Sequence, residues 1–410
     1  MSSGESEQYD LIIVGGGMVG ISLALLLRAQ ACHWKILLVE AQAYPEGGAV
    51  GYRPSFDARS TALSWSSRKI FDQIGLWAEL EQRVSPISQV HVSDRGHVGL
   101  SRILAEEAGV EALGYVTENR WLGEVLLRAL RKSAVELRAP AQVDAVRIVR
   151  DGAQVTLAGG EQLRGRLLVV ADGAGSATAG QLGIHYSSQS YGQTAIIANI
   201  ALSQPHQGIA YERFTDWGPM AMLPLPDCED CPRSALVWTL PQDKASSLMA
   251  SNESEFLLTL QDRFGFRLGK LVSVGQRFSY PLSLTLATEQ VRRHLVVLGN
   301  AAHSLHPVAG QGFNLSLRDA AGLAEVLGEA RREEDFAGLD ALERFQANQA
   351  ADQRNTTLFS DSLPRLFGLD TKVVQLARNS GLVAMDLLAP LRNRFARFGM
   401  GLAAREARHG

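Results

Sequence analysis

The chain has 410 residues, of which 46% are hydrophobic and 20% are charged, and its formal net charge is −3. This composition excludes a disordered chain, and a pI of about 6.3 excludes the basic surface of a nucleic-acid-binding protein. The length allows two or three domains with a large core. Glycine is frequent, at 39 residues, which indicates many tight turns and close backbone approaches.

The cysteines and the first apolar stretch bear on the compartment. Only Cys32, Cys228 and Cys231 are present, which argues against a secreted disulfide framework. The last two form a C-x-x-C in a predicted loop. No second pair of ligands follows at a similar spacing, so we expect no metal site. The low number of cysteines fits the reducing cytoplasm best. Leu11–Leu27 carries no charge, but acidic residues precede it and glycines interrupt it, which excludes a signal peptide or a membrane span.

The N-terminal segment has the pattern of a dinucleotide-binding βαβ unit. An apolar strand over Asp10–Val14 leads into a glycine turn, a helix is predicted over Ile21–Ala29, and a second strand over Ile36–Val39 follows. Three glycines occupy the G-x-G-x-x-G positions, and an acid closes the second strand: Gly15, Gly17, Gly20 and Glu40.

Each of these residue types has a physical reason at its position. Gly15 permits the tight turn, and Gly17 lets a pyrophosphate approach backbone N–H groups at the helix N-terminus. Gly20 allows the helix to pack closely on the strand, and Glu40 can accept hydrogen bonds from ribose hydroxyls. The motif predicts a bound nucleotide but does not distinguish FAD from NAD.

Three further segments resemble conserved parts of flavoenzymes. In FDARSTAL, Arg59 precedes a predicted helix over Ser64–Leu76 and can clamp a diphosphate or form a surface ion pair. A strand over Leu167–Ala171 leads into Asp172-Gly-Ala-Gly-Ser, and one over His294–Leu298 leads into GNAAHSLHPVAGQGFN. A helix is predicted after this last loop, over Leu315–Leu327.

On these motifs the chain resembles the class A flavoprotein monooxygenases, whose second and third fingerprints read D-G-x-x-S and G-D-A-A-H…P…G-Q-G-x-N. It departs from them at Asn300, where most members have Asp, and in lacking their Arg shortly after Ser176. DARSTALS, TENRWLGEVLL, ERFTDWGPMAMLPLP and the GNAAH segment are similar to the ubiquinone-biosynthesis hydroxylases. Asn300 and the ERFT segment are most similar to the 2-octaprenyl-6-methoxyphenol hydroxylases within that family.

The resemblance implies an α/β fold with a Rossmann-like FAD-binding domain of the p-hydroxybenzoate hydroxylase type. We predict this domain to comprise residues 1–73, 112–182 and 281–345, with an inserted, mainly antiparallel substrate domain over 74–111 and 183–280. Strands are expected there at Ala195–Leu202, Gly208–Phe214, Met220–Pro224 and Ala235–Thr239. A helical C-terminal region covers 346–410.

The resemblance also assigns site residues. Pro307 and the Gly310 backbone are expected to shape the oxygen site, whereas His303 and His306 could act as bases but are better explained as structural or flavin-adjacent. A prenyl channel over the substrate sheet, or ordinary core packing, would account for Trp217, Met220, Met222, Leu223 and Trp238. The residues expected to bind FAD are Gly15, Gly17, Gly20, Glu40, Arg59, Arg120, Asp172, Asn300, Gly310, Gln311, Gly312 and Asn314.

The implied reaction is the hydroxylation of a polyprenylated phenol in ubiquinone biosynthesis with NAD(P)H and O₂ through a flavin hydroperoxide. A hydroxylase of soluble catabolic phenols and a flavin-bound scaffold subunit of a quinone-biosynthesis complex are the alternatives. Pro390–Gly410 holds five arginines and one acid, which indicates either a peripheral contact with the inner membrane or a partner, or a packed terminal helix with a solvated face.

Overall fold

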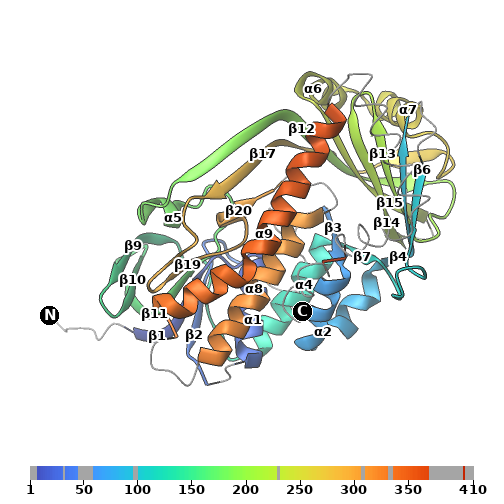
Figure 1. Cartoon of the computed structure of the whole chain (residues 1–410). Helices are drawn as coiled ribbons and strands as arrows, with labels where there is room; N and C mark the ends of the chain where they lie inside the picture. The colour runs from blue at the N-terminus through green and yellow to red at the C-terminus, as the bar shows by residue number, and fades with distance from the viewer. Residues whose placement is uncertain are drawn as a thin grey trace.

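Three β-sheets organise the chain, and helices cover their faces (Figure 1). The structure is a computed structural model, and it describes residues 7–30, 33–44, 59–95, 100–228, 231–305, 310–330, 336–368 and 400–401. The second half of the predicted C-terminal helical region, including nearly all of Pro390–Gly410, lies outside these residues. Within them, no helix combines the length and the apolar composition needed to cross a membrane.

The first sheet has the order β18-β19-β11-β1-β2-β8, and its central strands are parallel. These strands read as continuous apolar runs because both of their faces are buried. An antiparallel pair, β9 and β10, extends β11. The strands are β1 (Glu7–Val14), β2 (Ile36–Val39), β8 (Glu136–Arg138), β9 (Val143–Val149), β10 (Gly152–Leu157), β11 (Gln162–Val170), β18 (Val291–Arg292) and β19 (Leu295–Val297).

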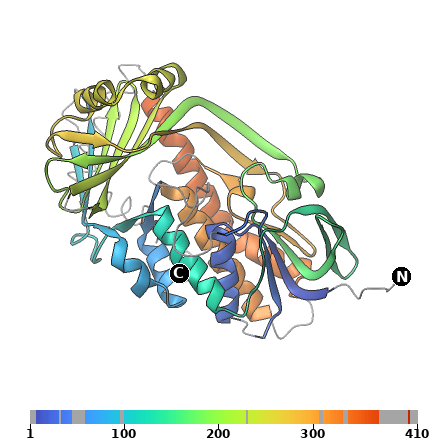
Figure 2. The ribbon, with the colours of Figure 1, turned by 180° about the vertical axis from the view of Figure 1, so that it is seen from behind.

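Helices cover one face of this sheet, and the β9–β10 pair with the short helix α5 (Ala177–Gln181) covers the other (Figure 2). The helical face holds the largest core of the molecule. Its helices are α1 (Met18–Gln30), α4 (Asn119–Lys132) and α8 (Gln311–Ala330), and α9 (Leu339–Gly368) packs on α8.

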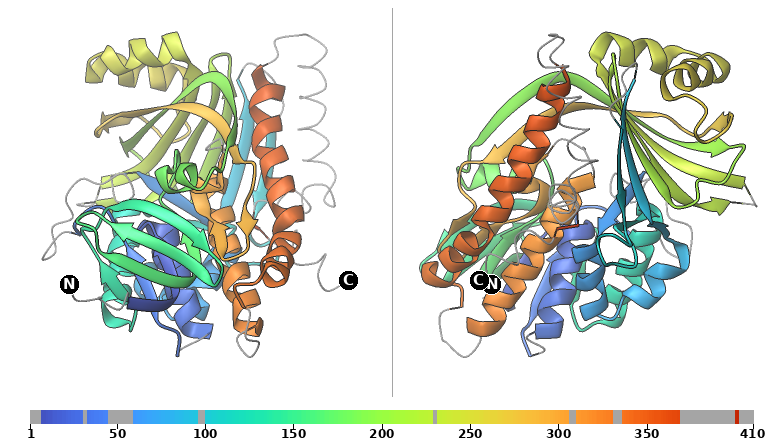
Figure 3. Two further views of the ribbon diagram at one scale, coloured as in Figure 1. Left: turned by 90° about the vertical axis from the view of Figure 1, so that its left-hand side faces the viewer. Right: turned by 45° about the vertical axis from the view of Figure 1, so that its right-hand side comes forward.

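The second sheet is mainly antiparallel and has the order β20-β17-β12-β15-β14-β13-β5-β6, with β16 beside β12. Two helices, α6 (Gln242–Ala250) and α7 (Glu253–Phe264), lie on its outer face, away from α1 and α4 (Figure 3). The strands are β5 (Gln89–Asp94), β6 (Leu100–Leu104), β12 (Tyr186–Leu202), β13 (Ile209–Thr215), β14 (Gly218–Cys228), β15 (Cys231–Pro241), β16 (Leu271–Val274), β17 (Phe278–Ala287) and β20 (His303–Ser304).

A small third sheet, β3-β7-β4, lies between the other two. It shares a hydrophobic cluster with the inner face of the second sheet, in which Val116 of β7 meets Ala210 of β13 and Ala235 of β15. Its elements and those that flank it are β3 (Ser60–Ser64), α2 (Trp65–Gln73), α3 (Trp77–Leu80), η1 (Glu81–Arg83), β4 (Ser85–Ile87) and β7 (Gly114–Glu118).

The strands and helices predicted from the sequence are present, but the sheets differ from the predicted domain boundaries. The predicted boundary after residue 280 cuts through β17, whose whole length pairs with the long strand β12, and β20, which we placed with the FAD-binding domain, pairs with β17 in the second sheet. α3, which we placed with the substrate domain, packs into the core of the first sheet through Trp77 and Leu80. Cys228 ends β14 and Cys231 begins β15, and the two residues pair across these strands as free thiols. The sequence had predicted a loop at both positions.

Candidate functional site

The glycine turn between β1 and α1 is closely packed on both sides. Gly15 has a φ of +111°, and a Cβ there would lie 2.3 Å from the carbonyl oxygen of Ala171 at the end of β11. A Cβ on Gly20 would lie 1.9 Å from the oxygen of Gly15. Gly17 is half-buried just before α1, whose first turn carries no acidic residue. No acidic side chain of the helix itself therefore opposes the positive end of the α1 dipole.

The Glu40 carboxylate is fixed beside this turn. Its Oε2 accepts the backbone N–H of Gly16 at 2.8 Å, and its Oε1 accepts that of Gln42 at 2.9 Å. The hydroxyl of Tyr44 donates to the oxygen of Gly16 at 2.6 Å. Each carboxylate oxygen keeps a second lone pair, which can accept a hydroxyl of a ligand. Tyr44 was not singled out from the sequence, because no pattern links it to the glycine turn.

Two further loops begin where neighbouring parallel strands end, at the same edge of the sheet. After β11, Asp172 is exposed, and Gly173 has a φ of +94° with open space where a Cβ would lie. After β19, Gly299 has a φ of +66°, and a Cβ there would approach Val19 of α1 to 3.2 Å. Asn300 follows within η2 (Gly299–Ala301) and is exposed. The structure thus brings the three predicted motifs together at one edge.

The N-terminus of α8 is held against β3 by one side chain, Asn314. Its Nδ2 donates to the oxygens of Ala62 and Gly310, both at 2.8 Å. Its Oδ1 accepts the N–H of Ser64 at 2.9 Å and the hydroxyl of Ser67 at 2.7 Å. Because these four bonds use the whole amide, we interpret Asn314 as a residue that positions the loop.

The other residues of this loop leave space at the start of α8. Gly310 has a φ of +63° and packs against Ala62, Gln311 is 2% exposed, and Gly312 would carry a Cβ into open space. The first turn of α8 contains no acidic residue, as in α1. Pro307 and His306 lie outside the described residues, so their predicted places in the oxygen site are not described by the structure.

The two predicted cations differ in their surroundings. The Arg59 guanidinium lies 5.1 Å from the ring centre of Tyr280, and its backbone oxygen accepts the N–H of Asn119 at 2.7 Å. It therefore stands between β3 and the second sheet. The Arg120 side chain is 58% exposed and pairs with Glu124 at 3.3 Å, so it is free to turn toward an anion.

His303 is part of a buried polar cluster. Its Nε2 lies 2.7 Å from Oδ2 of Asp319, which also accepts the side-chain N–H of Gln353 at 3.0 Å. The side chains of the His–Asp pair are 5% and 0% exposed. The pair is therefore enclosed between β20, α8 and α9.

The side chains predicted to line a prenyl channel lie in a different place. Met220, Met222 and Trp238 are fully buried in the core between the second sheet and helices α6 and α7, and Trp217 packs against that core. The rings of Trp217 and Trp238 stack at 6.0 Å, and Trp238 meets Phe256 of α7 edge-on. This placement corrects the prediction, because these residues face away from the first sheet, whereas Leu223 packs against the inner cluster.

The inner face of the second sheet carries smaller side chains and one acid. Along one row of paired residues lie Ile197, Val237, Ala221 and Glu212. Glu212 is half-buried, and burial raises the pKa of its carboxyl to about 7. The sequence interpretation did not single it out, because Arg213 follows it directly and only the structure shows that Glu212 shares its face with Ala210 and Phe214.

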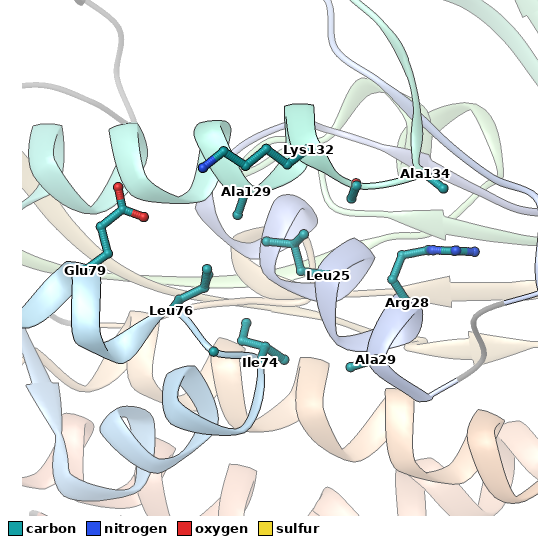
Figure 4. A pocket seen from close by; sticks show the side chains of 11 residues that line it. Leu25, Arg28, Ala29, Ile74, Leu76, Glu79, Ala129, Lys132 and Ala134 are labelled. Carbon is teal, nitrogen blue, oxygen red and sulfur yellow. The ribbon is translucent and has the colours of Figure 1, made fainter.

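A separate cavity of about 540 Å³ lies at the far end of the helical layer (Figure 4). Arg28 and Lys132 line it, and they lie in the last turns of α1 and α4, where cations complement the helix dipoles. Leu25, Ile74 and Leu76 supply apolar walls. It lies at the opposite ends of the helices from the glycine turn and is not part of the site. Among the described residues, no group of His, Cys, Asp and Glu side chains gathers around a metal position.

Comparisons with known proteins agree with this arrangement. The family profile described as FAD binding domain matches residues 8–355. Ubiquinone hydroxylase UbiL of Rhodospirillum rubrum is 38% identical over 401 residues, which cover 96% of this chain and 89% of the relative. The chain belongs to the ubiquinone-biosynthesis flavin hydroxylases. A second member of this family, the 3-demethoxyubiquinol 3-hydroxylase of Escherichia coli, is 30% identical over 402 residues, which cover 97% of this chain and 100% of that protein.

The fold of this flavin hydroxylase is also that of p-nitrophenol 4-monooxygenase PnpA from Pseudomonas putida. The two structures give a TM-score of 0.76 over 95% of this chain and 97% of that one, at 18% sequence identity. At this identity the likeness concerns the fold alone. The shared fold combines a mainly parallel sheet with a mainly antiparallel one.

The residues of the site fit FAD. The sheet edge offers two helix N-termini without acidic residues, α1 and α8, to an electron-rich cofactor. The Glu40 carboxylate is oriented by two backbone N–H groups and can accept ribose hydroxyls. Gly173 and Gly312 leave their Cβ positions open, and Arg59 supplies a cation between β3 and the second sheet. These features are compatible with the cofactor of the family.

Proposed function

We propose that this chain hydroxylates the aromatic ring of a polyprenylated phenol in ubiquinone biosynthesis, with NAD(P)H and O₂ as co-substrates. The observation that carries the proposal is the 38% identity to ubiquinone hydroxylase UbiL over 96% of the chain. The apolar inner face of the second sheet supports it, because Ile197, Ala221 and Val237 present hydrophobic surface toward the cofactor side.

FAD supplies the chemistry: reduced by NAD(P)H, it activates O₂ so that one oxygen atom enters the ring. The chain binds the cofactor and the substrate and orients them. The turn of Gly15 and Gly17 and the start of α1 receive the diphosphate, with Arg59 as a cation, and Glu40 holds the ribose. Water is excluded by the second sheet, which closes over the reacting ring.

The remaining predicted contacts belong to the same proposal. We assign Asp172, Asn300 and Arg120 to the exposed rim of the cofactor site, where Asn300 can hydrogen-bond the ribityl chain without a charge. Gln311 and Gly312 stand at the start of α8, where the backbone can approach the flavin ring. Asn314 acts through the loop that it positions.

The test is single-turnover and steady-state assay of the protein reconstituted with FAD. We expect NADH or NADPH oxidation that accelerates with a prenylated phenol, and a product that gains one oxygen atom from isotopically labelled O₂. Gly17→Val, which blocks the diphosphate approach, is the flavin-free control. Turnover of soluble phenols but not of prenylated ones would indicate the catabolic alternative, and restoration of quinone synthesis by the flavin-free variant would indicate a scaffold.

A substrate with a long prenyl chain resides in a lipid phase, so the proposal includes a cytoplasmic protein that works at the inner-membrane surface, in or outside a quinone-biosynthesis complex. Flotation with vesicles that contain anionic lipid and a prenylphenol measures this contact. Recovery of the protein only in the soluble fraction would contradict it.

A further inference from the structure

The position of Glu212 follows from the alternation of side chains along β13. Its neighbours Tyr211 and Arg213 point to the outer face, since Tyr211 packs edge-on against Phe264 of α7 and Arg213 donates to the oxygen of Arg263. Successive residues of a strand point to opposite faces. Glu212 therefore points to the inner face, together with its paired residues Ala221 and Val92.

This inner face looks toward the cofactor site. Two residues before Glu212, Ala210 packs in one cluster with Val116 of β7, and Ala62 of β3 packs against the same cluster. The oxygen of Ala62 is bound by Asn314 at the start of α8. Glu212 therefore lies two residues along β13 from the contact between the second sheet and the FAD-binding domain.

The neighbours of Glu212 do not satisfy a carboxylate. Its row holds Ile197, Val237, Ala221 and Val92, none of which can donate a side-chain hydrogen bond, and ends at Ser101 of β6, one pair beyond Val92. Within the described ranges, the structure gives Glu212 no ion pair and no side-chain hydrogen bond. An acid of this kind on a protein surface that faces a reaction site is costly for folding, which points to a role with a ligand.

A second carboxylate points to the same face: Asp94 of β5 lies two residues beyond Val92, opposite Phe214. The cations on the surrounding elements have other partners. Arg233 of β15 pairs with Glu118 at 3.2 Å and donates to the oxygen of Pro226, and Arg59 lies against Tyr280. Burial is the cause of the raised pKa of Glu212, so the carboxyl is poised to exchange a proton near neutral pH.

We propose that Glu212 faces the bound substrate and that its carboxylate accepts the proton of the phenol hydroxyl while the ring is oxygenated. This inference rests on the proposed function. The O–H bond of the phenol breaks and an O–H bond forms on Glu212, which makes the ring more electron-rich. Overall, the phenol, O₂, NAD(P)H and one proton give the hydroxylated ring, NAD(P)⁺ and water, and Glu212 returns its proton to the product.

The first experiment compares the wild type with Glu212→Gln, which keeps the shape and removes the base. We expect kcat to fall roughly 100-fold, as is typical for the loss of a general base, and the acid limb of the pH profile near neutrality to disappear. Asp243→Asn is the control, because Asp243 is exposed on α6 at the outer face, and its profile should match the wild type. An unchanged rate and pH profile in Glu212→Gln would overturn the assignment while leaving the proposed function standing.

A substrate with its own ionised hydroxyl sharpens this result. A nitro-substituted prenylphenol is already a phenolate at neutral pH, so it needs no base. The ratio of wild-type to Glu212→Gln rates should shrink for this substrate to within about tenfold. An equal loss with both substrates would show that the substitution disturbs the fold and would overturn the role as a base.

A binding experiment tests the same assignment without turnover. Binding the nitrophenolate to wild-type holoenzyme above neutral pH should place a proton on Glu212, so that calorimetry in buffers of different ionisation enthalpy reports uptake of one proton for each ligand bound. Glu212→Gln should take up none. Binding to the wild type without proton uptake would overturn the proposal. Absence of hydroxylation of any prenylphenol by the wild type would instead contradict the proposed function.

Discussion

The two faces of the antiparallel sheet are built from different side chains, although the same strands supply both. The outer face carries large residues, Met220, Met222 and Trp238, which fill the core beneath α6 and α7. The inner face carries Ala221 and Val237 from the same two strands, β14 and β15. The outer face therefore contributes stability through packing, whereas we propose that the inner face borders the ligand. Large apolar side chains on a strand mark the core more reliably than they mark a binding site.

The strongest test of this comparison is Trp238→Ala on the outer face. Removing a fully buried indole should lower the free energy of unfolding by roughly 3–5 kcal/mol, because a cavity remains. Denaturant unfolding of the FAD-bound protein measures the change. The protein that remains folded should keep its kcat and KM. A selective rise in KM without loss of stability would mean that Trp238 contacts the substrate after all.

The second test uses the acid on the inner face. The pKa of Glu212 lies near 7 in the native state and near its ordinary value of 4.5 in the unfolded chain. Between these values the native state binds more protons, so stability falls as the pH rises from about 4.5 to 7 and stays reduced above it. Glu212→Gln should remove this fall and stabilise the protein by up to roughly 3 kcal/mol at about pH 8, with little change at about pH 5.

Chemical denaturation at the two pH values, without substrate, measures the free energy of unfolding of the wild type and of Glu212→Gln. Asp243→Asn should shift stability equally at both. Equal effects of Glu212→Gln at both pH values would contradict a raised pKa of this carboxyl.

A smaller effect is expected from Ala221→Leu on the inner face. If that face borders the ligand, the added side chain narrows the site, and KM for a prenylphenol should rise about tenfold, which corresponds to roughly 1.4 kcal/mol. FAD content and unfolding free energy should change little. A loss of stability of about 1–3 kcal/mol with unchanged KM would instead mean that this face is closely packed.

The smallest effect should come from Met222→Leu on the outer face. The two side chains have similar volume, so the free energy of unfolding should change by less than about 1.5 kcal/mol. The kinetic constants for a prenylphenol should stay at the wild-type values. A clear kinetic change from this conservative substitution would connect the outer core to the substrate site.

The local parts of the fold were predictable from the sequence. The strand, glycine turn and helix of the first motif depend on neighbours within a few residues, and the structure has them at β1, Gly15 and α1. The same holds for the loops after β11 and β19. Parallel strands end at one edge of a sheet, so the meeting of these motifs also followed from their pattern.

The parts that depend on distant partners were not predictable. Which face of β14 meets helices α6 and α7 depends on how two segments pack in space, and the alternation of side chains is the same for either choice. The hydrogen bonds of Tyr44 and Asn314 link segments that no local pattern connects. Glu212 was overlooked because its chemistry arises from what surrounds it, not from its own sequence neighbours.

The hydrogen bonds of Asn314 have a consequence for folding during synthesis. They join Ser64 to a residue 250 positions later in the chain, and β1 pairs with β11, more than a hundred residues away. Contacts of such long range form slowly. When only the first motif has been synthesised, the loops after β11 and β19 and the start of α8 are still missing from the cofactor site. We therefore expect flavin capture to follow release of the nearly complete chain, so that supply of FAD acts on finished molecules rather than on nascent ones.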